Sequence, residues 1–152
     1  MKYSLDMNDS NDILLLSDDH PIVFYDGVCY LCDSSVKFIL GKDSLGIFRF
    51  CTLQDASIHN LIPSNFDIKA KKSVILLHKG IFYDRSDAAI HIMILLGGWL
   101  SWLGYLSLAF PKFIRNAGYN LIAKYRYVWF GKSDTCLMPN PRFKSQFLKF
   151  EP

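Results

Sequence analysis

The N-terminus lacks the basic segment and long apolar run of a secretory signal peptide, because its apolar run covers only residues 13–16. The 152-residue chain also lacks internal repeats and biased tracts, which excludes solenoids, collagen-like chains and low-complexity linkers. Its formal net charge is only +3, too small to indicate a nucleic-acid partner by itself. Because the N-terminus shows no secretory signal, we expect a cytoplasmic location.

The composition is that of an ordinary folded domain. Hydrophobic residues make up 51% of the chain and charged residues 20%, enough apolar material for a core. Residues 1–20 hold five acidic and one basic side chain, whereas residues 112–152 hold two acidic and eight basic ones. We expect an acidic N-terminal lead over residues 1–20 and one domain over residues 21–152. The basic end is either a solvated surface or a contact for an anionic membrane or acidic partner.

Short apolar runs and turn residues predict the order strand, helix, strand, helix, hairpin and helix. The strands are expected at residues 22–25, 46–53, 73–77 and 81–83, and the helices at 29–40, 54–61 and from 87 onward. A helix between neighbouring strands implies a parallel pair, while the tight turn at residues 78–80 implies an antiparallel hairpin. The result is an α/β fold with a mixed four-stranded sheet flanked by helices. Ser86 is expected to cap the helix that begins at Asp87.

Residues 88–110 contain no Asp, Glu, Lys or Arg, and this run is long enough to cross a bilayer. Glycines at 97, 98 and 104 interrupt it. We therefore expect a buried helix to about residue 96 and a helical C-terminal extension from about residue 99, with a last helix over residues 111–130. The apolar segment 99–110 is expected to contact a membrane surface or a partner protein rather than to span a membrane. The aromatic side chains of the last helix are expected to pack inward.

Asp26, Cys29 and Cys32 lie between the first expected strand and the first expected helix. Two cysteines three positions apart at a helix start share one face and are close enough for a disulfide bond. The helix N-terminus stabilises a thiolate at Cys29, and a thiolate is the nucleophile of thiol–disulfide exchange. We expect Cys29 to attack a disulfide and Cys32 to resolve the mixed disulfide. Asp26 would either move the Cys32 proton or order the Asp-Gly turn.

Two other interpretations of the cysteine pair stay open. The pair could be half of a metal site that Cys51, Cys136, His59 or His78 completes, although the sequence has no second CxxC or HxxxH pair. It could also be a pair of buried structural thiols in a non-enzymatic docking module. The redox interpretation needs no metal and no cofactor. Cys51, within the second strand, is expected to be buried and inert.

The chain resembles the DCC family of thiol-disulfide oxidoreductases, whose Asp-x-x-Cys-x-x-Cys motif is matched by Asp26, Cys29 and Cys32. The further matches are Phe48-Arg49-Phe50, Leu53-Gln54, Arg85-Ser86-Asp87-Ala88-Ala89, Ala123-Lys124-Tyr125-Arg126-Tyr127, Trp129-Phe130-Gly131-Lys132, Cys136 and Pro139. The resemblance covers residues 21–139. It implies a thioredoxin-like fold and a thiol or disulfide substrate, either a protein or a low-molecular-weight thiol. No nucleic-acid-binding motif accompanies these residues.

Four further residues are candidates for substrate binding. Ser73 stands where thioredoxins have a cis-proline before the third strand, and the missing proline argues against an extended protein chain as substrate. Ser86 and Asp87 lie at the junction where glutaredoxin-like proteins hold glutathione, and a helix N-terminus binds anions. Arg85 beside them either pairs with Asp26 or a ligand carboxylate, or stays on the surface.

Overall fold

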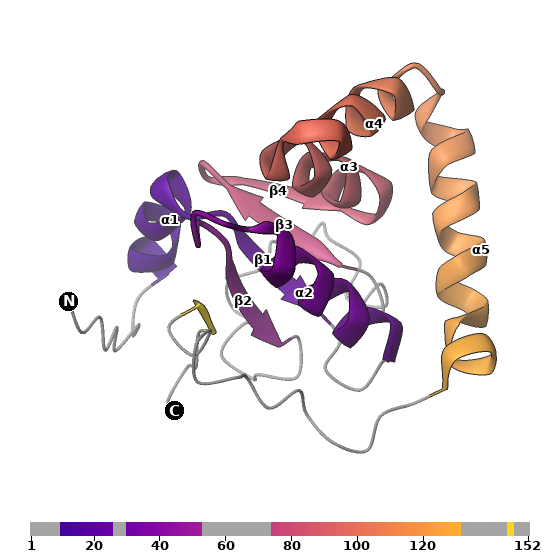
Figure 1. The fold of residues 1–152 in the computed structure, drawn as a ribbon, viewed down its shortest axis with the longest axis horizontal. Coiled ribbons are helices and arrows are strands. Elements are labelled where there is room, and N and C mark those ends of the chain that lie inside the picture. Colours follow the sequence, from indigo (N-terminus) through magenta and orange to yellow (C-terminus); the bar gives the residue numbers. More distant parts are fainter. Residues whose placement is uncertain (1–9, 26–29, 53–73, 132–145, 148–152) are drawn as a thin grey trace.

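One β-sheet carries helices on both of its faces (Figure 1). A computed structural model of the chain describes residues 10–25, 30–52, 74–131 and 146–147. The strands are β1 (Ile22–Tyr25), β2 (Arg49–Thr52), β3 (Ile75–His78) and β4 (Ile81–Asp84). The helices are α1 (Ser10–Asp19), α2 (Tyr30–Lys42), α3 (Arg85–Leu96), α4 (Gly98–Leu108) and α5 (Lys112–Phe130). The helix expected at residues 54–61 lies outside the described residues.

The sheet is mixed, with the strand order β2-β1-β3-β4. β1 and β2 are parallel, and α2 forms the crossover between them. β3 runs antiparallel to both β1 and β4. This is the arrangement of a thioredoxin-like fold, and it confirms the predicted α/β class with four strands.

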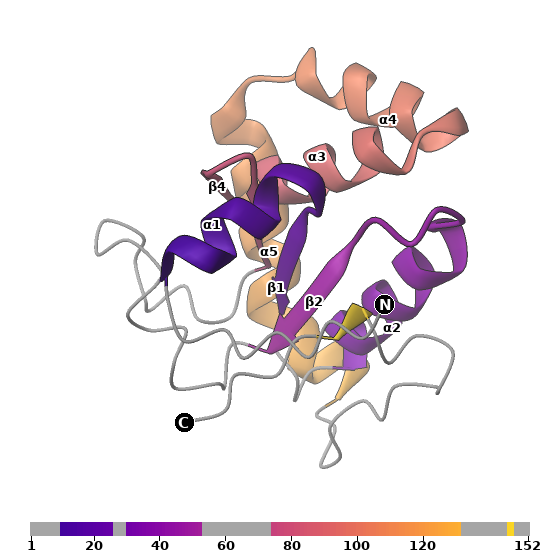
Figure 2. The ribbon, with the colours of Figure 1, turned by 90° about the vertical axis from the view of Figure 1, so that its left-hand side faces the viewer.

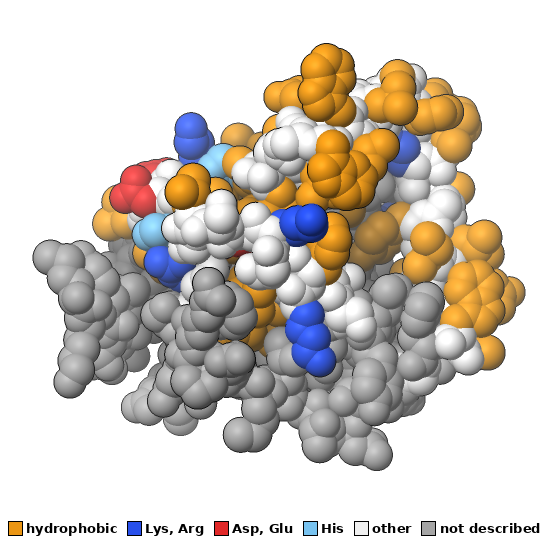
Figure 3. Space-filling model, in the orientation of Figure 1, with side chains coloured by type: hydrophobic (Ala, Val, Ile, Leu, Met, Phe, Trp, Pro, Cys, Tyr) orange, Lys and Arg blue, Asp and Glu red, His pale blue; other side chains and the backbone are white. Residues whose placement is uncertain are grey.

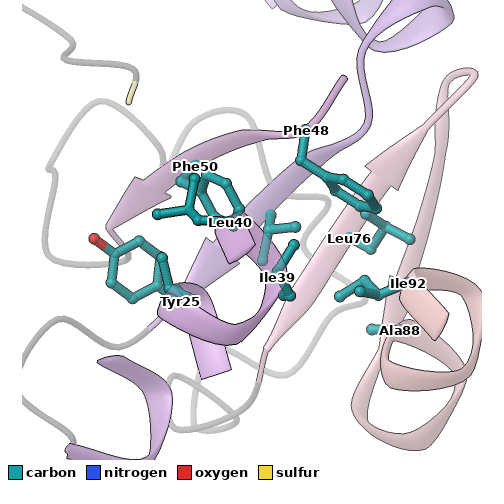
Figure 4. Packing of buried hydrophobic residues seen from close by; sticks show 10 residues of the cluster. Tyr25, Ile39, Leu40, Phe48, Phe50, Leu76, Ala88 and Ile92 are labelled. Carbon is teal, nitrogen blue, oxygen red and sulfur yellow. The ribbon is translucent and has the colours of Figure 1, made fainter. Parts of the chain in front are cut away.

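The two faces of the sheet have separate hydrophobic cores, because successive side chains of a strand point to opposite sides. Ile22 and Phe24 of β1 pack with Ile13 of α1 on one face. Val23 and Tyr25 pack on the other face with α2 and α3 (Figure 4). The helix α1 therefore belongs to the packed structure, although it lies within the expected acidic lead. The division of the chain at residue 20 remains a prediction.

The predicted hairpin turn before β4 is confirmed, whereas the predicted helix cap after β4 is wrong. Lys79 and Gly80 both have a left-handed backbone, with φ of 51° and 72°, as a two-residue type I′ hairpin requires. This confirms the predicted hairpin. The expected cap at Ser86 is wrong: α3 begins at Arg85, and Asp84 occupies the N-cap position without a side-chain hydrogen bond. The backbone at Arg85 is left-handed, with φ of 49°, and α3 begins there, two residues before the predicted start at Asp87. The Ser86 hydroxyl donates a hydrogen bond to Asn116 of α5 instead of capping the helix.

The C-terminal extension follows the predicted breaks, since α3 ends at Leu96 and α5 follows Pro111. α4 packs on α3, and in two perpendicular views it lies at the outside of the molecule (Figure 1, Figure 2). The expectation that the aromatic residues of α5 pack inward is wrong for Trp129 and Tyr125, which are exposed and stack on each other. Among the described residues, no helix is long and apolar enough to cross a membrane.

Candidate functional site

The register of the sheet brings several strand ends to one edge. β1 ends there at Tyr25, and Phe24 pairs with Ile75 at the beginning of β3. Ile75 in turn pairs with Asp84, the last residue of β4. Two antiparallel pairings therefore place the end of β1, the beginning of β3 and the end of β4 side by side.

The predicted site residues follow or precede these strand ends along the chain. Asp26 comes directly after β1, Ser73 lies two residues before β3, and Arg85 directly follows β4. Cys29 directly precedes α2, and Cys32 is the third residue of that helix. Asp26, Cys29, Ser73 and the side chain of Cys32 lie outside the described residues, so their roles remain predictions.

An apolar cavity of about 410 Å³ lies between α2, α3 and α5, over the face of the sheet that carries Val23 and Tyr25. Its wall includes Tyr25, Ser34, Val74 and Ala89, each within two residues of a predicted site residue. Side chains from the middle of α2, from α3 and from α5 complete the wall. The cavity can therefore receive an apolar group close to described residues that neighbour the predicted site residues along the chain.

Helix α5 is held over this region by polar contacts with the beginnings of α3 and β3. Ser86 Oγ donates to Asn116 Oδ1 at 2.5 Å. The Asp87 carboxylate forms ion pairs with Lys112 Nζ at 2.9 Å and with Arg115 Nη1 at 2.8 Å. The Val74 N–H donates to the Tyr119 hydroxyl at 3.0 Å. Ser86 is buried and Asp87 is half-buried. The side chains of Ser86 and Asp87 therefore position α5, which forms one wall of the cavity.

The electrostatics of Asp87 follow from these contacts. Partial burial raises the pKa of its carboxyl group, but the hydrogen bonds and positive charges of Lys112 and Arg115 outweigh burial. The net result is a pKa below the ordinary value for aspartate. The carboxylate stays ionised at neutral pH and keeps both ion pairs.

Arg85 makes a loose ion pair, with its Nε 3.7 Å from Oδ2 of its neighbour Asp84. Its left-handed backbone is unusual for a residue with a side chain and costs about 1 kcal/mol. Strained residues of this kind cluster at functional sites. The observation favours Arg85 as a substrate contact, although its predicted partner Asp26 lies outside the described residues.

Several residues considered from the sequence lie away from this edge. Arg49 pairs with Ile22 at the opposite edge, where its guanidinium donates to the carbonyls of Gly46 and Phe48. His78, a possible metal ligand, lies at the far end of β3. Cys51 is buried on the α1 face, opposite α2, as expected for an inert thiol. Within the described parts of the chain, no three His, Cys, Asp or Glu side chains form a potential metal site.

The sequence reasoning missed the contribution of α5 to the site. Tyr119, Ile122 and Ala123 line the cavity, and Arg115 binds Asp87. Tyr119 follows Arg115 by four positions, and Ile122 and Ala123 follow Tyr119 by three and four, so all four residues share one side of the helix. That spacing was the available signal. It could not indicate which partner the face meets, because the contacts join residues about thirty to forty-five positions apart.

Comparisons with known proteins agree with the motif resemblance. The sequence model of the DCC1-like thiol-disulfide oxidoreductase family matches residues 23–132. Uncharacterized protein YuxK of Bacillus subtilis (strain 168) is 37% identical over 129 residues, covering 84% of this chain and 93% of that protein. The DCC family protein At1g52590, chloroplastic, of Arabidopsis thaliana is 34% identical over 120 residues, covering 78% and 70% respectively. No solved structure matches the chain.

Proposed function

Because the chain belongs to the DCC1-like thiol-disulfide oxidoreductase family, we propose that it catalyses thiol–disulfide exchange through Cys29 and Cys32. The observation that carries the proposal is the position of the CxxC pair. Along the chain, Cys29 directly precedes α2 and Cys32 is the third residue of this helix, while β1 before them ends at Tyr25, which lines the cavity. A helix N-terminus favours the thiolate form of a cysteine, which is the reactive form.

The proposed reaction transfers two electrons from the protein to a disulfide substrate. The Cys29 thiolate attacks one substrate sulfur, forms a mixed disulfide and releases the first substrate thiolate. Asp26 accepts the proton of Cys32, whose thiolate then attacks the Cys29 sulfur and releases the second substrate thiolate. The products are a Cys29–Cys32 disulfide and two reduced thiols, and the reverse sequence oxidises a dithiol.

The cavity favours a substrate with a compact apolar group over an extended peptide. Its wall is mainly apolar, and the Val74 N–H at the start of β3 is already bound by the Tyr119 hydroxyl. An extended peptide therefore cannot use that N–H for a backbone hydrogen bond. Ser73 and Arg85 would flank the substrate disulfide, while Ser86 and Asp87 keep α5 in place. A cytoplasmic location remains a prediction.

The reduction potential of the Cys29–Cys32 pair tests the proposal. The full chain is equilibrated in glutathione buffers, free thiols are alkylated, and the motif peptide is read by mass spectrometry. We expect a reversible two-electron transition between about −120 and −270 mV, the range of known dithiol catalysts. Cys29→Ser should abolish exchange and Cys32→Ser should accumulate mixed disulfides, whereas the control Cys136→Ser should keep the motif transition.

Failure of a Cys29–Cys32 disulfide to form at any potential would overturn the redox proposal. The cysteines would then be structural or metal-binding, and metal analysis of the purified protein would separate these two cases. Full exchange activity in Cys29→Ser would instead disprove the assigned nucleophile.

A further inference from the structure

α4 directs its large apolar side chains to solvent instead of to the protein. The exposed ones are Trp99, Trp102, Leu103, Tyr105, Leu106 and Leu108, and Trp102 is 80% exposed. The face toward α3 contains Leu100 and Gly104, which are buried, while the two serines of α4 are only half-buried. A surface helix in water normally has the opposite pattern, with its polar residues outward.

The exposed apolar surface continues past the end of α4. Phe110 is 56% exposed, and Phe113 in the first turn of α5 is 74% exposed. In the space-filling view, hydrophobic side chains gather over α4 and along α5 (Figure 3). A continuous exposed apolar surface of this kind is typical of a docking site.

The charges around this surface identify the kind of partner. Between Asp87 and Asp134 the sequence contains no Asp or Glu but five Lys or Arg residues. Lys112 lies between the two exposed phenylalanines, and its side chain is 63% exposed even though its Nζ contacts Asp87. Exposed Trp and Tyr beside flexible basic side chains complement a lipid surface, with rings at the headgroup level and positive charge near anionic headgroups.

We propose that α4 and the first turn of α5 dock this protein peripherally on an anionic membrane surface. α4 has 11 residues and a length of about 16 Å, so it would lie in the plane of the interface and not cross a hydrocarbon core of about 30 Å. A second copy of the chain is a poorer partner, since a symmetric contact would bring together two surfaces that both carry more positive than negative charge. The docking uses none of the cysteines and is independent of the proposed exchange reaction.

Flotation of the full-length protein with lipid vesicles tests the docking. The vesicles contain either phosphatidylcholine alone or phosphatidylcholine with about a quarter phosphatidylglycerol, and binding to the anionic vesicles should be stronger and weaken with salt. Trp102→Glu should lower the partition coefficient by about tenfold or more, because it replaces an inserted ring by a charge. Leu106→Glu on the same face should act in the same direction.

Leu15→Glu is the matched control, because Leu15 is 67% exposed and belongs to α1, which packs on the face of the sheet opposite α3 and its neighbour α4. Circular dichroism verifies that each variant is folded. The double variant Cys29→Ser, Cys32→Ser should bind vesicles like the wild type, which separates this test from the exchange reaction. The proposal is overturned if the wild type does not float with anionic vesicles, or if Trp102→Glu binds as well as Leu15→Glu. It is also overturned if Trp102→Glu converts a dimer into a monomer and leaves vesicle binding unchanged.

Discussion

Gly104 shows how one residue fixes the position of α4. A Cβ atom at this position would lie 2.7 Å from Cγ1 of Ile94 and 3.3 Å from the backbone oxygen of Ile90. The close approach of α4 to α3 therefore depends on the missing side chain. Helices that pack at a glycine can bring their backbones nearer than helices that meet through larger side chains.

Gly104→Ala should lower the free energy of unfolding by about 1–3 kcal/mol, because the added methyl group overpacks the contact between α3 and α4. Gly118→Ala in α5 is the matched control, since nothing lies within 4 Å of a Cβ built there. In that open helical position alanine should be neutral or stabilise the protein by up to about 1 kcal/mol. Urea denaturation measures both values, and equal effects of the two substitutions would contradict the role of Gly104.

The burial of Cys51 could be predicted from the sequence, whereas the exposure of Trp129 could not. Cys51 was predicted to be buried because it lies in a short apolar β-prone run, and it is 2% exposed. Trp129 was predicted to pack inward because the last helix was expected to be amphipathic, with its aromatic side chains toward the protein. It is 58% exposed, although its position 14 residues after Arg115 places it on the same side of α5. The polar contacts that hold α5 lie in the first half of the helix, between Lys112 and Tyr119, and Trp129 lies near its other end. Local hydrophobicity cannot indicate how far along a helix the contacts with the rest of the protein extend.

At the scale of elements, the contact between α5 and the start of α3 contributes a pH-dependent stability. Asp87 has a lowered pKa in the folded protein, so folding favours its ionised form. The contribution is fully present above the unfolded value of about 3.9 and is lost as the pH falls through the lower folded pKa. The ion pairs are partly screened by solvent, so we expect a contribution of about 1 kcal/mol.

Asp87→Asn should therefore lower the free energy of unfolding by about 1 kcal/mol at pH 7, because the two cations lose their charged partner. The difference from the wild type should shrink when urea denaturation is repeated near or below pH 3. Asp19→Asn, an exposed position at the end of α1, serves as the control and should change little at either pH. A deficit of the same size at both pH values would show that the charge of Asp87 does not hold α5.

The order of elements was predictable because most boundaries have local causes. β1 is a short apolar run that is buried on both faces, and Gly97 and Pro111 interrupt the C-terminal helices near the observed breaks. The failure of Ser86 to cap α3 was not predictable, since its hydroxyl donates a hydrogen bond to Asn116 thirty residues later. Such a contact leaves no pattern in the surrounding sequence. For the same reason, the cysteine motif could be found from the sequence but the cavity wall supplied by α5 could not.

At the scale of the whole molecule, the cavity and the α4 surface lie on different parts of the helical layer. The cavity is lined by α2, α3 and α5, whereas the exposed side chains of α4 lie on its side away from α3. A protein docked through α4 would thus leave the edge with the cysteine motif uncovered. Exchange and membrane docking can operate together, and variants at one site should leave the other unaffected.

Filling the cavity should change which substrates the protein accepts. Ala123 lines the cavity from α5, so Ala123→Phe should raise KM for an aromatic disulfide such as dithiodipyridine by about tenfold, the equivalent of losing about 1.4 kcal/mol of apolar burial. The kcat should change little, because the cysteines are not altered.

Ala117→Phe, at an exposed position two turns earlier in α5, is the matched control and should leave KM unchanged. Oxidised glutathione is polar and should be affected much less by either variant. If Ala123→Phe left the aromatic KM unchanged, or raised KM equally for both disulfides, the cavity would not be the site that selects apolar substrates.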